Sequence, residues 1–270
     1  PPYQLITSEQ ANAYREVGGF VLEDAFSAEE LSSLLCALDR IEAEANDRLA
    51  NVPENQPSIA RADEIVFSAH VILRSAEARA FAQHRVFAQL CHDLIGPRSR
   101  LYWDQLVYKR PGTVEEFPWH QDNGYGQLDP ATAISTLTAL DDADVENGCL
   151  WVLPGSHRRG QIDVSDRLSE KAKAAGADIS VNVERESDAM PVPIKTGDAV
   201  VLHCHLLHRS EGNLSVDRDR RILFMRYADA DAVEVYNDRQ PRLGPLLRGK
   251  TRFPEVAKFE QDLFEKNEKA

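Results

Sequence analysis

The sequence has few cysteines and no long apolar run, and each absence argues against a class of protein. Its four cysteines, Cys36, Cys91, Cys149 and Cys204, are scattered, and no two of them form a C-x-x-C pair. Such spacing favours reduced thiols over a disulfide framework. No window approaches the roughly eighteen consecutive apolar residues of a membrane-spanning helix. Residues 1–5 lack the basic and apolar regions of a signal peptide. We therefore expect a cytoplasmic protein with no membrane partner.

Positive charge is also scarce. The chain has 31 Lys and Arg residues against 44 Asp and Glu residues, which gives a formal net charge of −13. Nucleic acids and anionic membranes are bound by basic surfaces, so we expect no nucleic-acid partner. A cationic substrate is permitted by this balance but not indicated by it. The sequence does not indicate an oligomeric state.

The 270 residues, 43% of them hydrophobic, contain no internal repeat and no interdomain linker. The length suits one large domain or two small ones, and we predict a single domain over residues 1–270. Its first part, residues 1–99, is predicted to be a helical support. Capping residues and apolar periodicity predict helices over 8–17, over 28–49 and over 75–94, the last broken near Gln83 and His84. Short strands are expected at 20–22 and 65–73.

From residue 100 onward the pattern changes to short strands separated by turn signals. They are expected at 101–109, 117–122, 133–140, 148–153, 189–195, 199–203 and 221–227. Such a series is typical of a jelly roll or a related sandwich. We therefore predict a mainly β protein with a helical N-terminal layer. Residues 100–228 would form the β core, 158–188 a lid-like insertion with one helix near 169–175, and 229–270 a C-terminal extension with a helix from 254.

The strongest chemical signal is the pair His120 and Asp122 in the segment 117–122. Alternate side chains of a strand share a face, so these two would point the same way while Trp119 and Gln121 point the other way. One imidazole and one carboxylate on one face are two of the three donors in the two-histidine, one-carboxylate triad that binds Fe(II) in oxygenases. A further histidine must complete the set.

The candidates for that histidine are His203, His205 and His208. We favour His208, because Ser210 follows closely and an arginine pair, Arg220 and Arg221, lies downstream. A co-substrate with a carboxylate needs such a guanidinium, which fixes both charge and orientation. His203 and His205 are interpreted as strand residues or as groups behind the ligands.

Four stretches, in the same order along the chain, resemble the phytanoyl-CoA dioxygenase family of Fe(II)- and 2-oxoglutarate-dependent oxygenases. They span roughly residues 100–228. The stretches are Q-L-V-Y-K-R-P-G at 105–112, F-P-W-H-Q-D at 117–122, E-N-G-C-L-W-V-L-P-G-S-H at 146–157, and Gly197–Asp198 through His208, Ser210, Asn213, Ser215 and Arg220.

The resemblance implies a double-stranded β-helix (a jelly roll, cupin-like) with His120, Asp122 and His208 as the iron ligands. It also implies that Arg220 pairs with the distal carboxylate of 2-oxoglutarate, with Ser210 bonded nearby. Two further residues, Gln105 and Lys109, fall where members of the family line the co-substrate pocket. The chain departs from the family pattern at Arg209, which replaces a glycine, and by one extra residue before Arg220. That insertion leaves Arg221 as the alternative to Arg220, and we favour Arg220.

The implied cofactors are Fe(II), 2-oxoglutarate and O₂, and the implied reaction oxidises a small-molecule metabolite with release of succinate and CO₂. Because Asp122 is retained, hydroxylation, desaturation or ring closure is favoured over halogenation, for which related enzymes lack this carboxylate. A metal-dependent hydrolase and a non-catalytic cupin-like binding protein are the alternatives. The sequence does not identify the substrate. Its candidate contacts are Tyr102, Trp119, Asn123, Tyr125 and His70.

Overall fold

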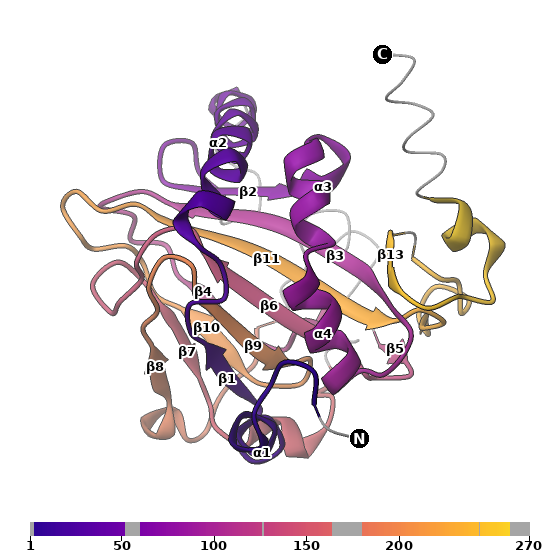
Figure 1. Cartoon of the computed structure of the whole chain (residues 1–270). Helices are drawn as coiled ribbons and strands as arrows, with labels where there is room; N and C mark the ends of the chain where they lie inside the picture. Colours follow the sequence, from indigo (N-terminus) through magenta and orange to yellow (C-terminus); the bar gives the residue numbers. More distant parts are fainter. Residues whose placement is uncertain (1–2, 52–59, 126, 164–179, 243, 260–270) are drawn as a thin grey trace.

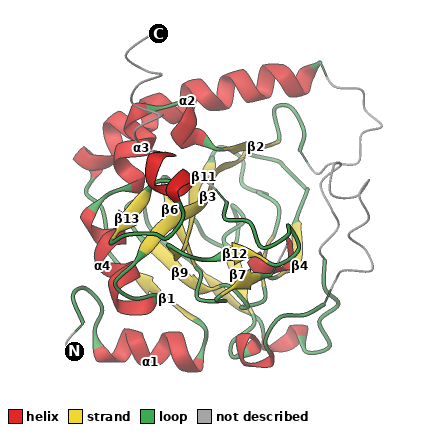
Figure 2. Cartoon of the chain, turned by 90° about the vertical axis from the view of Figure 1, so that its right-hand side faces the viewer, coloured by secondary structure: helices red, strands yellow, loops and turns green. Residues whose placement is uncertain are grey.

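The computed structural model describes residues 3–51, 60–125, 127–163, 180–242 and 244–259. Its N-terminal part is helical, as predicted, with α1 (Ser8–Glu16), α2 (Ala28–Ala50), α3 (Ala76–Ala82) and α4 (Arg85–Leu94). Thr7 and Ser27 begin α1 and α2 through capping boxes, in which cap and third residue exchange hydrogen bonds. In both views α1 and α2 lie at opposite ends of the molecule (Figure 1, Figure 2).

A large antiparallel sheet forms the centre of the described structure. Its strand order is β1-β9-β6-β11-β3-β13, and β2 pairs with β3 beside β13. The two longest strands, β11 and β3, are paired along nearly their whole lengths. The strands are β1 (Gly19–Leu22), β2 (Ile65–Ala69), β3 (Ser99–Lys109), β6 (Ile134–Ala139), β9 (Ala199–His203), β11 (Arg220–Asp229) and β13 (Leu246–Arg248).

A smaller antiparallel sheet, in the order β4-β10-β7-β8, completes the jelly roll. Its strands are short, and β10 lies between β4 and β7. Two further strands, β5 (Leu128–Asp129) and β12 (Val233–Glu234), pair with each other. The strands of the smaller sheet are β4 (Phe117–His120), β7 (Leu150–Val152), β8 (Met190–Val192) and β10 (His208–Ser210).

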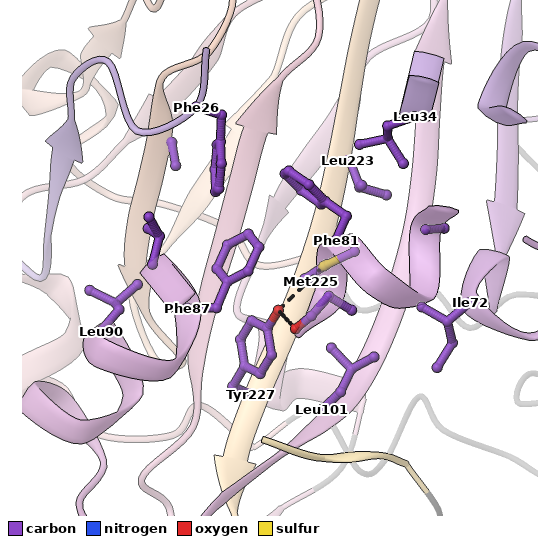
Figure 3. Packing of buried hydrophobic residues seen from close by; sticks show 14 of the residues in the cluster. Phe26, Leu34, Ile72, Phe81, Phe87, Leu90, Leu101, Leu223, Met225 and Tyr227 are labelled. Carbon is purple, nitrogen blue, oxygen red and sulfur yellow. Dashed lines mark hydrogen bonds between the residues drawn. The ribbon is translucent and has the colours of Figure 1, made fainter. Parts of the chain in front are cut away.

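The helices cover one face of the large sheet, and this contact forms the main apolar core. Figure 3 shows Phe81 and Phe87 from α3 and α4 packed over Met225 and Tyr227 of β11. The hydroxyl of Tyr227 donates to the carbonyl oxygen of Ala82 at 2.9 Å, so its one polar atom is satisfied inside the core. Because strand side chains alternate, the odd-numbered residues of β11 face the helices and the even-numbered ones face the interior of the jelly roll.

The strand and helix boundaries differ from the prediction in a few places. The strand expected to reach Leu73 ends at Ala69, and the 3₁₀ turn η1 (Val71–Leu73) follows, with His70 in the left-handed region at φ 57°. The strand β10 was not predicted, nor were β5, β12 and β13. The helix expected near 169–175 and most of the loop expected at 51–61 lie outside the described residues. A helix begins at residue 254, as predicted, and residues after 259 lie outside the description.

No helix in the described part of the chain is both long enough and apolar enough to cross a membrane. The division of the chain into 1–99, 100–228 and 229–270 within a single domain stays a prediction.

Candidate metal centre

His120, Asp122 and His208 meet between the two sheets. The Nε2 atoms of His120 and His208 lie 3.8 and 3.6 Å from the same carboxylate oxygen, Asp122 Oδ1. The two histidines face each other across the β4–β10 pair, with ring centroids 4.1 Å apart. All three residues are buried, with 4–6% of their surface exposed. Two imidazole nitrogens and one carboxylate oxygen therefore converge on one small volume, which is the donor set of a facial metal triad.

Both imidazoles are oriented by hydrogen bonds from their other nitrogen. His120 Nδ1 donates to the carbonyl oxygen of Pro118, and His208 Nδ1 donates to that of Leu206, each at 2.9 Å. A carbonyl oxygen only accepts, so each Nδ1 carries the proton and each Nε2 keeps a free lone pair. This arrangement is typical of histidines that bind metal ions.

The charge states of the cluster also suit a metal ion. Burial and the neighbouring His208 lower the pKa of His120 to about 3, so its imidazole is neutral near pH 7. Burial alone would raise the pKa of Asp122, but His208, His120, Arg226 and a bond from Ser135 together hold it below its usual value. A neutral imidazole and an ionised carboxylate are the protonation states that ligate metals.

The prediction that a strand runs through residue 122 is wrong. Strand β4 ends at His120, and Asp122 begins the 3₁₀ turn η2 (Asp122–Tyr125). The turn is held from the large sheet, because Ser135 Oγ of β6 donates to Asp122 Oδ2 and Arg226 of β11 donates to the Asp122 carbonyl oxygen at 3.2 Å. Asp122 thus reaches the two histidines by a turn and not by strand alternation.

A cavity of about 550 Å³ opens beside the three side chains, and one end of it is cationic. Arg220 and Lys109, directly opposed on β11 and β3, both line it and are at least 95% buried. Lys109 Nζ donates to Ser210 Oγ at 3.1 Å, and Arg220 Nε donates to the Gly148 carbonyl oxygen at 3.0 Å. Burial lowers the pKa of Arg220 to about 10, and burial together with Arg220 holds that of Lys109 well below its usual value. Gln105 lines the same cavity.

Arg221 lies on the opposite face of β11. It forms ion pairs with Asp141 at 2.7 Å and with Asp39 at 2.8 Å. Among the described residues, Arg220 has no carboxylate within 4.0 Å, whereas Arg221 is fully paired. Of the two arginines, only Arg220 faces the cavity with charge available for a ligand.

The other end of the cavity, where Trp103 and Arg226 are opposed on β3 and β11, combines aromatic rings with two further arginines, and most of it was missed by sequence reasoning. Trp103, Phe224 and Arg226 could have been found by counting in twos from Gln105 and Arg220 along their strands. No signal marked the residues that the chain contributes after β11. The aromatic and arginine residues of the lining that were missed are Phe67, Trp103, Phe117, Arg209, Phe224, Arg226, Tyr236 and Arg242.

The five residues predicted to contact the substrate do not all line the cavity. Tyr102 lines the cavity, and its hydroxyl donates to Glu234 at 2.5 Å. Trp119 does not line it, because it faces away from His120 and its Nε1 donates to Glu186. Asn123 is fully buried and bonded to His205 and Arg226, and His70 lines a separate, smaller cavity. Tyr125 ends η2, and its side chain lies outside the described part of the structure.

His203 and His205 lie behind the cavity. Their ligand atoms and that of Cys204 are within 4.8 Å of one another. However, His203 Nδ1 already accepts a hydrogen bond from the backbone N–H of His205, and His205 Nε2 lies 3.1 Å from Asn123 Nδ2. Neither residue lines the cavity, in contrast to His208.

Residues 14–222, more than three quarters of the chain, match the phytanoyl-CoA dioxygenase (PhyH) family. The chain belongs to this family. It is 33% identical over 143 residues to phytanoyl-CoA dioxygenase 1 of Oryza sativa, which covers 51% of this chain and 47% of that protein. An ectoine dioxygenase of Sphingopyxis alaskensis is 29% identical over 88% of this chain and 78% of its own length. The chain spans about half the length of the rice protein and of its Arabidopsis thaliana counterpart, at 47% and 54%.

Solved structures with the same fold include oxygenases of natural-product and ectoine metabolism. The α-ketoglutarate-dependent carbocyclase SnoK from nogalamycin biosynthesis is 23% identical, with a TM-score of 0.67 over 93% of this chain and 96% of its own. The EctD protein of S. alaskensis with bound Fe is 23% identical, with a TM-score of 0.66 over 93% and 90%. At these identities the likeness establishes the jelly-roll fold with its helical N-terminal layer.

Proposed function

We propose that this protein is a non-haem Fe(II)- and 2-oxoglutarate-dependent dioxygenase, with His120, Asp122 and His208 as the iron ligands. The observation that carries the proposal is that the three donors and the buried Lys109–Arg220 pair line the same cavity. A triad supplies the metal site, and a cationic end supplies the place for an anionic co-substrate. Family membership and relatives with bound Fe or 2-oxoglutarate support the same reading.

Bound Fe(II) would supply the oxidative chemistry, with O₂ as oxidant and 2-oxoglutarate as the co-substrate that releases succinate and CO₂. The chain's own part is placement and electrostatics. His120 and His208 keep their Nε2 lone pairs directed at one point, and Asp122 supplies the negative charge. Arg220 would pair with the distal carboxylate of 2-oxoglutarate, while Lys109, Ser210 and Gln105 complete its surroundings.

The organic substrate would be a small molecule that enters at the aromatic end. Trp103, Phe224 and Tyr102 line this end, and stacking or apolar contact with such rings positions a substrate carbon near the metal. SnoN, a neighbour at 24% identity, has been captured with Fe³⁺, α-ketoglutarate and nogalamycin RO. Hydroxylation, desaturation and cyclisation of a metabolite all fit the retained Asp122. A cytoplasmic location stays a prediction.

The direct test is an anaerobic titration of the Fe(II)-loaded protein with 2-oxoglutarate. Binding is measured by calorimetry and by the charge-transfer absorption of the chelated metal. Saturable binding at one site, and succinate release once air is admitted, are expected. A metal hydrolase with the same triad would have no use for Arg220 and Ser210. Metal binding without any 2-oxoglutarate binding would therefore contradict the dioxygenase assignment.

A further inference from the structure

We propose that Ser135 and Arg226 are positioning residues that leave only one oxygen of Asp122, Oδ1, available to the metal ion. The inference rests on the proposed function, because it concerns how the carboxylate of that site is presented. Neither residue is among the ligands or the co-substrate contacts. Both lie on the interior face of the large sheet, directly opposed in the register of β6 and β11.

The two oxygens of Asp122 have different surroundings. Oδ1 lies within 3.8 Å of both Nε2 atoms of the triad, whereas Oδ2 accepts a short hydrogen bond from Ser135 Oγ. Ser135 is completely buried, so no water competes for this bond. A hydroxyl bonded to an ionised carboxylate forms one of the stronger classes of hydrogen bond. The carboxylate is therefore held in one rotation, with Oδ2 turned away from the histidines.

Arg226 fixes the same turn by hydrogen bonds to the backbone of Asp122 and to the side chain of Asn123. One guanidinium nitrogen donates to the Asp122 carbonyl oxygen at 3.2 Å, and the other donates to Asn123 Oδ1. Asn123 Nδ2 in turn lies 3.1 Å from His205 Nε2. The Tyr102 ring covers the guanidinium at 5.0 Å. This chain of contacts spans from the large sheet to the segment that leads into β10, so it ties the turn to the strand that carries His208.

The consequence concerns the number of open positions at the metal. A carboxylate that binds through both oxygens takes one more coordination position than one that binds through a single oxygen. A facial triad supports oxygenase chemistry because the remaining positions stay open for co-substrate and O₂. The Ser135 bond opposes binding through Oδ2 and thereby protects a position that 2-oxoglutarate requires.

Ser135→Ala tests this through two binding constants measured separately by calorimetry. The first is that of Mn(II) for the protein, and the second that of 2-oxoglutarate for the Mn(II)-loaded protein. With Oδ2 released, we expect Mn(II) to bind as tightly as before or more tightly, and 2-oxoglutarate to bind roughly tenfold more weakly. Ser135→Thr, which keeps the hydroxyl, should restore the wild-type values.

Thr136→Val is the matched control. Thr136 is the next residue of β6 and also has a buried hydroxyl, but it donates to the Met225 carbonyl oxygen and does not touch Asp122. This change should alter neither constant beyond about twofold of wild type, although losing a buried hydrogen bond lowers stability. A shift in 2-oxoglutarate binding of the same size as in Ser135→Ala would mean that general loosening of the sheet is responsible, and the assignment would fail.

Arg226→Lys provides a second variant if Ser135→Ala does not fold. It keeps the charge but loses the two guanidinium hydrogen bonds to residues 122 and 123. We therefore expect Mn(II) affinity within about threefold of wild type and weaker 2-oxoglutarate binding. Equal weakening of both ligands, or no change in either, would overturn the inference while leaving the dioxygenase assignment intact. A wild-type protein that binds no Mn(II) would instead overturn the metal site itself, and the positioning role with it.

Discussion

The two ends of the cavity are built differently. The cationic end consists of buried residues where two paired strands end and begin, with Lys109 and Arg220 directly opposed and each at most 5% exposed. The aromatic end is assembled from β3, β11 and the chain after β11, and some of its residues are much more accessible, such as Tyr236 at 45%. The first end is therefore specified by sheet register alone, whereas the second also depends on how the segment after β11 packs.

This difference separates two kinds of recognition. A co-substrate shared by a whole family needs one fixed arrangement of charge, which a buried sheet provides. A substrate that varies among relatives is better met by segments whose sequence can change without disturbing the sheet. Two predictions test this division directly, and two more concern the metal site and the histidines behind the cavity.

The largest effect is expected at the proposed metal site. Replacing His208 with Ala removes one of two imidazoles, so we expect metal-dependent 2-oxoglutarate turnover to fall below detection. His205→Ala should leave turnover measurable, because His205 does not line the cavity. Succinate production and Mn(II) affinity provide the measurements. If His205→Ala eliminated turnover and His208→Ala preserved it, the ligand assignment would be wrong.

The next effect concerns the cationic end. Arg220→Ala should raise the apparent KM for 2-oxoglutarate by roughly ten- to a hundredfold, since a charge-assisted pair is worth ~1.5–3 kcal/mol. Arg221→Ala is the matched control on the adjacent position. Its guanidinium is bound by Asp141 and Asp39, so it should change stability and leave the KM nearly unaltered. Similar KM values for the two variants would remove Arg220 as the carboxylate partner.

A smaller and complementary effect is expected at the aromatic end. Trp103→Leu removes an indole that lines the cavity two residues from Gln105. We expect the dissociation constant of 2-oxoglutarate to stay within about twofold of wild type, because, among the described residues, the one hydrogen bond of Trp103 to a proposed co-substrate residue is long, from its Nε1 to Gln105 Oε1 at 3.4 Å. The KM for the organic substrate should change. Calorimetry with 2-oxoglutarate checks the first part before any substrate is identified. A loss of 2-oxoglutarate affinity as large as that of Arg220→Ala would show that the two ends are not independent.

The smallest effect is a pH dependence behind the cavity. Burial, followed by repulsion from His205 and His157, lowers the pKa of His203 to about 4, below the ~6.5 of an unfolded chain. Between those values the unfolded state binds more protons, so the free energy of unfolding should fall as pH drops from about 6.5 to 4. His203→Gln should flatten part of this slope in denaturant titrations at several pH values. An unchanged slope would mean that other groups govern acid sensitivity.

Much of the fold could be predicted from local signals. Ser27 with Glu30 marked the start of α2, and strand-forming segments bounded by turn signals marked β3 and β11, because caps and turns are properties of neighbouring residues. Strand β10 has only three residues, His208–Ser210, and was missed, since so short a strand is fixed by its partners and not by its own composition.

The candidate site was predictable where motif and strand alternation agreed, and not where tertiary packing decided. His120 and His208 lie within recognisable sequence motifs, so both were predicted to be metal ligands. The turn at Asp122 was read as strand, because nothing in the local sequence shows that Ser135 and Arg226 hold it. Arg242 lines the cavity from the segment after β11, where no periodic sequence pattern predicts its position. Trp119 was named for its place in the motif, yet it packs on the far face.

Strand β11 carries both Arg220 and Arg226 on its interior face, six residues or ~20 Å of extended chain apart. Alternate side chains of a strand face the same side of the sheet. Inserting or deleting one residue between Arg220 and Arg226 would therefore turn one of the two side chains toward the helical layer. The spacing between Arg220, the proposed co-substrate partner, and Arg226, which bonds the Asp122 turn, can thus change only in steps of two residues. The segment after β11, which contributes Tyr236 and Arg242 to the cavity, is free of this constraint, because its length can change one residue at a time.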